Sequence, residues 1–227
     1  GHTAENLAKK YSISRERQEQ MALESHQKAS KAVEKGEFKD EIIPVNGISE
    51  DGCIRPDTAL ESMAQLKPAF DKEGVVTAGT SSPLTDGAAA VIVCSEDYAK
   101  SNKLKMLAYV RGMAISGCSP EIMGIGPVVS SQKALKRAAL KLEDMDIIEM
   151  NEAFAAQSLA CVDELGIDMS KLNIHGGALA MGHPLGASGA RITGKAASLL
   201  QNNGARYALS TMCVGGGQGC ATILERA

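Results

Sequence analysis

Three side chains that could carry out covalent chemistry stand directly after predicted strands: Asn151 in IIEMNEAFAAQ, His183 in AMGHPLGASG and Cys213 in TMCVGGGQG. Ligand sites of α/β sheets gather at the carboxyl ends of strands, so we expect the three to converge. A histidine is the usual base that converts a thiol into a reactive thiolate. An asparagine amide can orient a water or donate to an oxyanion. This combination suits acyl transfer through a thioester.

Glycines accompany both the histidine and the cysteine. His183 lies in the run NIHGGALAMGHPLGASGARI, and Gly215 begins the GGG that follows Cys213 by one residue. Without a side chain, glycine lets backbone N–H groups approach a reacting carbonyl closely. A helix is predicted to start near Ser188, and its N-terminal dipole disfavours an imidazolium ion. We therefore expect His183 to be available as a neutral base.

Each of these features also has an ordinary structural explanation. A loop histidine is often a surface residue, an asparagine after a strand is often a turn or N-cap residue, and a strand-end cysteine can simply pack in the core. The stretch GHPLGASGA resembles a phosphate-binding loop only weakly, because it lacks both the Lys-Ser/Thr pair and the spacing G-x-G-x-x-G. The spacing of the imaginable zinc ligands matches no common zinc motif; these are His175, His183, Cys213 and Cys220.

The composition indicates a soluble globular protein. Of the 227 residues, 44% are hydrophobic and 22% are charged, with a net charge of -3. Mixed charge argues against nucleic-acid binding, and the apolar runs are too short to cross a membrane. No signal-peptide pattern opens the chain. The six cysteines are scattered without a CxxC pair, which favours buried thiols in a reducing compartment, the cytoplasm or an organelle matrix in a eukaryote.

The helices and strands that position the candidate residues are predicted from the spacing of apolar residues and from capping, glycine and proline residues at the element ends. Helices are predicted over 3–36, with N-caps at Thr3 and Ser14, and a short helix near 58–65 lies in an otherwise irregular region. Residues 88–94 read as a buried strand. The rest alternates as βαβαβαββ and predicts an α/β domain with a mixed five-stranded sheet. Its strands are expected at 108–117, 146–150, 172–175, 208–213 and 221–225, and its helices at 130–140, 152–165 and 188–200.

Five motifs resemble those of the thiolases, and the resemblance extends over the whole chain. They are TAGTSSPLTDGAAA, MGIGP, NEAFAAQ, GGALAMGHPLGASGAR and CVGGGQG. The variants GTSS and GQG resemble degradative 3-ketoacyl-CoA thiolases more than acetoacetyl-CoA-forming ones. The resemblance implies a layered α-β-α-β-α fold of two similar halves. It divides the chain into a partial loop domain at 1–78, the end of the N-terminal half with a connector at 79–103, and the C-terminal thiolase domain at 104–227.

The resemblance also implies a reaction and roles for residues. A 3-ketoacyl-CoA and CoA give a shortened acyl-CoA and acetyl-CoA, or the reverse condensation, as in fatty-acid β-oxidation and lipid metabolism. His183 matches the residue that activates a nucleophilic cysteine and binds the thioester oxygen. Asn151 matches the residue that holds a water for the same oxyanion, and Cys213 matches a second cysteine that carries protons. The N–H of Gly215 matches a donor of the other oxyanion hole.

The resemblance further implies contacts with CoA. Ser82 matches a contact of the pantetheine arm, Phe154 lines the same region, and Lys67 in LKPAF lies where a basic residue can meet the nucleotide end. CoA is a substrate here, and neither a metal nor a redox cofactor is implied. We expect the full-length protein to be a homo-oligomer, a dimer or tetramer, with acyl-CoA and CoA as its partners and with neither nucleic-acid nor membrane binding.

A complete thiolase also has an upstream nucleophilic cysteine, which no residue here matches. We therefore expect this sequence to be the C-terminal part of a thiolase and the chain alone to be inactive. The strand at 88–94, buried in a complete thiolase, would here lack the strands that it pairs with, and its exposed edge and apolar face should make the chain prone to association. Two alternatives stay open. The first is a ketosynthase-like condensing enzyme, which shares the fold. The second is a non-catalytic fragment that serves as a binding or oligomerisation module.

Overall fold

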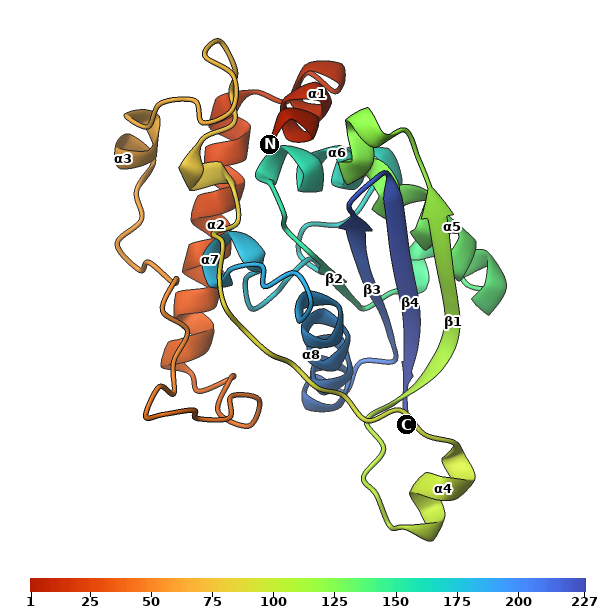
Figure 1. Ribbon diagram of the computed structural model, residues 1–227. Coiled ribbons are helices and arrows are strands. Elements are labelled where there is room, and N and C mark those ends of the chain that lie inside the picture. Colours follow the sequence, from red (N-terminus) through yellow and green to blue (C-terminus); the bar gives the residue numbers. More distant parts are fainter.

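The computed structural model describes residues 1–227 and contains one four-stranded sheet with helices on both faces (Figure 1). The strands are β1 (Ala108–Gly117), β2 (Ile147–Met150), β3 (Tyr207–Val214) and β4 (Gln218–Arg226). Their order is β1-β4-β3-β2. β4 is antiparallel to both neighbours, whereas β2 and β3 run parallel. The predicted α/β class and mixed sheet are confirmed.

Alternate residues of each strand supply two separate cores, as the two-residue period of a strand requires. Ile148 packs in the larger cluster, on the face that α5 (Gly126–Ala138) and α6 (Ala155–Leu165) cover. Its neighbour Ile147 packs in a smaller cluster under α8 (Ser188–Asn202). Leu209 and Ala208 of β3 divide in the same way. The parallel strands β2 and β3 are therefore buried on both faces between helices. β1, at the edge of the sheet, leaves Val110, Met113 and Ile115 exposed.

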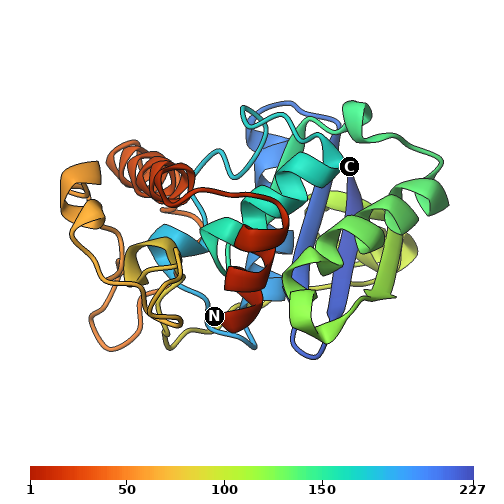
Figure 2. The same ribbon diagram turned by 90° about the horizontal axis from the view of Figure 1, so that it is seen from above.

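The N-terminal segment packs beside this layered unit (Figure 2). Its helices are α1 (His2–Lys10), α2 (Arg15–Glu34) and the short α3 (Leu60–Ala64). Ser14 caps α2 by accepting a hydrogen bond from the N–H of Arg17, so the predicted N-cap is confirmed. The N-cap predicted at Thr3 is wrong, because α1 begins at His2 and the carbonyl of Gly1 accepts the first hydrogen bonds.

Shorter elements complete the chain. They are the 3-10 turns η1 (Ala78–Thr80), η2 (Pro120–Ile125) and η3 (Leu142–Asp144), and the helices α4 (Glu96–Ser101) and α7 (Ala178–Met181). The sequence did not predict α7. No helix combines the length and apolar character needed to cross a lipid bilayer.

The predicted buried strand at 88–94 is wrong. The segment is extended but pairs with no strand, and it is exposed throughout, with Ile92 at 85%. Together with the residues before it, this segment forms a strap, residues 82–94, that runs across α7 and α8 (Figure 1). In the strap, Val91 lies against Gly194 and Gly87 against Pro184. High strand propensity does not make a strand without a neighbouring backbone to complete the hydrogen-bond ladder.

The predicted fifth strand at 172–175 is reduced to a single parallel bridge between Leu172 and Ile148. The backbone leaves the extended conformation at Asn173, which has a φ of 43°, and again at Gly176, with a φ of 77°. The amide side chain of Asn173 instead bonds the backbone N–H and C=O of Met150. A side chain thus replaces the ladder that a fifth strand would have formed.

Candidate active site

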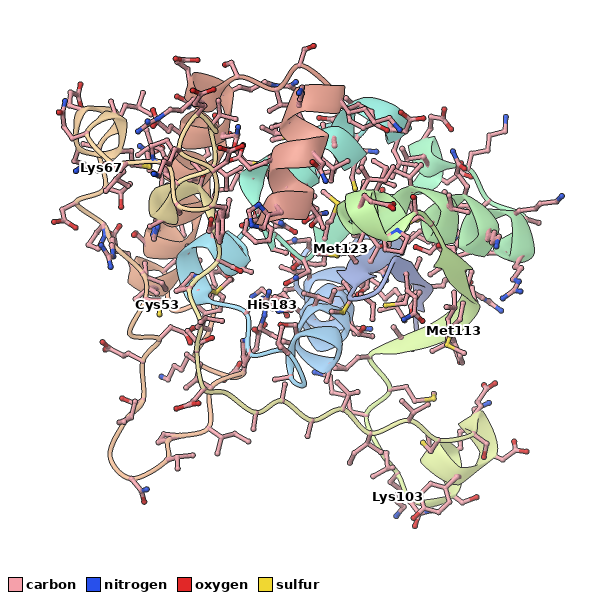
Figure 3. The ribbon with its side chains drawn as sticks, turned by 45° about the horizontal axis from the view of Figure 1, so that its top comes forward. Cys53, Lys67, Lys103, Met113, Met123 and His183 are labelled. Atoms are coloured by element: carbon pink, nitrogen blue, oxygen red, sulfur yellow. The ribbon has the colours of Figure 1, made fainter.

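The loop between α7 and α8 carries His183 and holds its ring by one short contact. The imidazole Nδ1 lies 2.6 Å from the Oγ of Ser188 in the first turn of α8. The side chain is half-buried (labelled in Figure 3). Burial lowers the pKa of His183 below its ordinary value, and the positive charge of Arg191 lowers it further. His183 is therefore neutral near pH 7, as a base must be.

Asn151 directly follows β2 and is completely buried, with an exposed fraction of 0%. Its backbone N–H donates to the carbonyl of Thr211, which fixes the main chain. Its side chain is different, because neither Nδ2 nor Oδ1 has a hydrogen-bond partner. Buried amides are almost always paired, so an unpaired one indicates a place for a water or a ligand atom.

Cys213 lies near the end of β3 and is 4% exposed. Burial raises the pKa of its thiol to about 12, so the sulfur carries its proton at neutral pH. After it, the chain turns through Gly215 to Gly217. Gly216 and Gly217 have φ values of 83° and 90°, which favour glycine. The N–H of Gly215 donates to no group in the chain, and the residue is exposed. That donor is free for a ligand.

A short segment ties the histidine loop to the asparagine loop. The N–H of Ser82 donates to the carbonyl of Ala153 at 3.0 Å, two residues after Asn151. The next residue, Pro83, accepts a hydrogen bond from the N–H of His183 at 3.3 Å. The structure therefore brings Asn151, Ser82 and His183 into one region.

Cys213 reaches the same edge of the sheet from the other face. Along β3, Ser210 contacts Thr193 of α8, whereas Thr211 contacts Ser131 of α5. Strand alternation places Cys213 on the face of Thr211, while His183 precedes the helix on the opposite face. No hydrogen bond joins the two side chains. The predicted convergence of His183 and Cys213, with side-chain atoms within about one water's reach, stays a prediction.

Ser82 and Phe154, both predicted to contact CoA, are near neighbours, because Ser81 and Phe154 form an antiparallel bridge. The ring of Phe154 also packs edge-on against Phe70 at 5.8 Å. Lys67 is exposed and lies beside α3, well apart from His183 (Figure 3). That separation suits a residue at the far end of a long ligand. The contacts of all three with CoA stay predictions.

Glu152 holds the site together, and the sequence did not indicate this role. The residue is 2% exposed. Its carboxylate accepts hydrogen bonds from the Oγ–H of Ser25 at 2.7 Å, the Nδ2–H of Asn173 at 2.7 Å and the N–H of Leu179 at 3.1 Å. Ser25 belongs to α2 and Leu179 to α7, whereas Asn173 lies in the segment between α6 and α7. The available signal in the sequence was that Glu152 is the one charged residue of the run NEAFAAQ.

A small cavity of about 110 Å³ lies under the strap, beside the histidine loop. Its lining includes Thr85, Pro184, Arg191 and Asp51. Burial raises the pKa of Asp51, although Arg191 opposes the shift. The side-chain atoms His175 Nδ1, Thr85 Oγ1 and Arg191 Nε are buried without partners. No three acidic, histidine or cysteine side chains gather as a possible metal site.

Known proteins match this arrangement over its whole length. The sequence model described as "Thiolase, C-terminal domain" matches residues 104–226, and the one described as "Thiolase, N-terminal domain" matches residues 1–97. The chain belongs to the thiolase family. Among curated thiolases, the 3-ketoacyl-CoA thiolase of Vibrio parahaemolyticus is 52% identical over all of this chain and 61% of its own length. That of Marinobacter nauticus is 50% identical over 61% of its length.

Two solved structures of related enzymes have the same fold. Human mitochondrial 3-ketoacyl-CoA thiolase, crystallised in complex with CoA, superimposes on all of this chain with a TM-score of 0.98 and 48% identity. The Bacillus anthracis acetyl-CoA acetyltransferase superimposes with a TM-score of 0.95 and 43% identity. This chain covers 58% of the first structure and 60% of the second. It thus spans about 60% of the length of the thiolases that it matches.

Proposed function

We propose that the whole protein is a 3-ketoacyl-CoA thiolase and that this chain supplies its base, one oxyanion site and its proton carrier. Thiolytic cleavage would convert a 3-ketoacyl-CoA and CoA into a shortened acyl-CoA and acetyl-CoA, and the reverse reaction would be a Claisen condensation. The names of the curated relatives support the substrate class. The relative crystallised with CoA supports CoA as a substrate.

The observation that carries the proposal is the unpaired amide of Asn151. A fully buried Asn151 with both polar side-chain atoms unbonded is costly unless a water or substrate atom satisfies it. It lies in the loop that Ser82 and Pro83 connect to His183. Two donors could stabilise the enolate oxygen of a thioester: a water held by the amide, and the Nε2–H of His183 once the ring has taken the proton of the nucleophilic cysteine.

Protonation states assign the other roles. Neutral His183 would remove the proton from a nucleophilic cysteine, whose thiolate attacks the 3-keto carbonyl. The bond between C2 and C3 then breaks, and the acetyl-CoA enolate takes a proton at its α-carbon. Cys213 carries that proton, because burial raises its pKa to about 12. The resulting thiolate would recover a proton from the incoming CoA thiol. The CoA thiolate would then attack the acyl-enzyme and release acyl-CoA, and the departing cysteine thiolate would take back its proton from His183.

The same protonation state argues against Cys213 as the nucleophile, because the thiolate is the reactive form. We therefore propose that an upstream cysteine of the whole protein attacks the substrate, and that the 227-residue chain alone shows no turnover. A homo-oligomeric state, a role in β-oxidation and a location in the cytoplasm or an organelle matrix belong to this proposal as well. A binding or oligomerisation module without turnover is the second candidate function. The protonated state of the buried Cys213, which argues against it as a nucleophile, supports this candidate.

The deciding experiment measures 3-ketoacyl-CoA cleavage by the complete enzyme and its variants. His183→Ala should lower kcat by about 10²–10⁴, the range for a lost base. Asn151→Ala should lower it by at most about 10²–10³, the range for one oxyanion donor. Asn203→Ala, at the exposed end of α8, serves as the matched control. Wild-type rates in both site variants would refute the assignment. Faster transfer from acyl-carrier-protein thioesters than from CoA thioesters would favour a ketosynthase.

A further inference from the structure

We propose that Ser188 is a positioning residue that holds His183 in the tautomer with its proton on Nδ1. In that tautomer Nε2 has the free lone pair and is the atom that accepts a proton. The catalytic consequence rests on the proposed function, but the tautomer itself is a property of this chain and can be measured without turnover.

Ser188 has the geometry of a fixed partner rather than of a chance neighbour. Its Oγ lies 2.6 Å from Nδ1 of His183 and 3.2 Å from the carbonyl oxygen of Pro184. The residue is 0% exposed, so water does not compete for the hydroxyl. Its backbone N–H also donates to the Pro184 carbonyl, at 3.1 Å. Side chain and main chain are therefore both anchored to the loop that carries the imidazole.

The hydroxyl has only one hydrogen to share between these two contacts. A carbonyl oxygen can only accept, whereas a neutral imidazole nitrogen either donates or accepts. Pro184 precedes Ser188 by four residues, and a serine hydroxyl near a helix start commonly donates to that carbonyl. When the Ser188 hydroxyl donates its hydrogen to the Pro184 carbonyl, its oxygen can only accept a hydrogen bond from the imidazole. Both contacts of Ser188 are then hydrogen bonds only if Nδ1 of His183 carries a proton.

The main chain restricts the ring from the other side. The N–H of His183 donates to Pro83, which lies on the strap, and Gly87 of the strap packs against Pro184. The backbone nitrogen of His183 is bonded to the strap and Nδ1 to Ser188, so Nε2 is the one nitrogen of this residue without a partner in the chain. The nitrogen left free is the one that the proposed reaction needs.

Nitrogen NMR of the 227-residue chain, with ¹⁵N-labelled histidine, tests the proposal. The spectrum is recorded above the histidine pKa range, where neutral rings give one protonated and one unprotonated nitrogen signal. His183→Gln identifies the signals among the four histidines. We expect Nδ1 of His183 to be protonated in the native chain, and Ser188→Ala to lose this preference. A native ring protonated on Nε2, or an unchanged preference in Ser188→Ala, would overturn the proposal.

Ser130→Ala is the matched control. Ser130 is also 0% exposed, and its hydroxyl also donates to the carbonyl four residues earlier, in α5, but no histidine touches it. Its removal should leave the His183 signals unchanged. If Ser188→Ala does not fold, Ser188→Cys replaces it, because a thiol is a much weaker hydrogen-bond partner of similar shape.

A kinetic measurement on the complete enzyme separates positioning from plain structural support. Ser188→Ala should lower kcat by about 10- to 100-fold, the effect of losing a group that orients a functional histidine. KM for the 3-ketoacyl-CoA should stay unchanged, because Ser188 is 0% exposed and a positioning role gives it no contact with substrate. A raised KM with unchanged kcat would contradict the positioning role. If His183→Ala kept wild-type rates while the tautomer was fixed as expected, the proposed function would fail and the tautomer assignment would stand.

Discussion

Glu149 should make the protein less stable as the pH rises, which is the opposite of the usual behaviour of a carboxylate. It lies in the middle of β2, is 1% exposed, and its Oε1 has no hydrogen-bond partner. Burial raises its pKa from 4.5 to about 8, even though Arg191 and Lys195 pull it down. In the unfolded chain the same group titrates near its ordinary pKa.

The sign follows from proton counting. Between pH 4.5 and 8 the unfolded state has released the proton of Glu149 while the folded state still holds it. Stability falls with rising pH wherever the unfolded state binds fewer protons. One pKa unit corresponds to about 1.4 kcal/mol, so the shift of Glu149 costs about 3 kcal/mol between pH 5 and pH 8.

Glu149→Gln removes the titration and keeps the shape. We expect the free energy of unfolding of the variant, minus that of the native chain, to grow by about 3 kcal/mol from pH 5 to pH 8. Urea unfolding at several pH values measures it. Burial also lowers the pKa of three histidines, which adds stability as the pH rises toward 6.5, but they are common to both chains and cancel; they are His26, His175 and His183.

Glu61→Gln, on the exposed side of α3, is the control and should show no pH-dependent difference. A difference between Glu149→Gln and the native chain that stays constant from pH 5 to pH 8 would refute the reasoning. It would mean that Glu149 is already ionised in the folded protein.

Three further results are expected. Iodoacetamide at neutral pH should alkylate the exposed Cys94 well before Cys213, whose pKa is raised to about 12, and peptide mass spectrometry would reveal the opposite order. Glu152→Ala should lower the free energy of unfolding by about 3 kcal/mol or more, because it leaves three buried donors unpaired, and a loss under 1 kcal/mol in urea unfolding would contradict its bridging role. Gly217→Ala should cost about 2 kcal/mol, because its φ is 90° and the new methyl would overlap backbone, whereas Gly215→Ala meets open space and should cost less; equal losses in thermal unfolding would refute the comparison.

Residue types and local spacing were enough to identify the chemistry of the site. Three polar or reactive residues follow predicted strands: Asn151, His183 and Cys213. A predicted helix begins after Asn151, and glycines lie close to His183 and Cys213. Local order also located β1 and the helices α5, α6 and α8. These signals act over a few residues, through periodicity and capping, so a sequence displays them directly.

Only the tertiary structure determined which distant segments pair as strands or form hydrogen bonds with one another. The apolar run at 88–94 has strand composition, yet it lies exposed because no backbone pairs with it. Glu152 bonds Ser25, which is 127 residues away, and no local pattern indicates that pair. Even Ser188, five residues from His183, took on a role only when the turn at Pro184 brought its hydroxyl to Nδ1. Local propensity determines which conformation a segment prefers. The hydrogen-bond partner of a buried polar group depends instead on how the whole chain packs. That packing also determines which polar atoms are left free for a substrate.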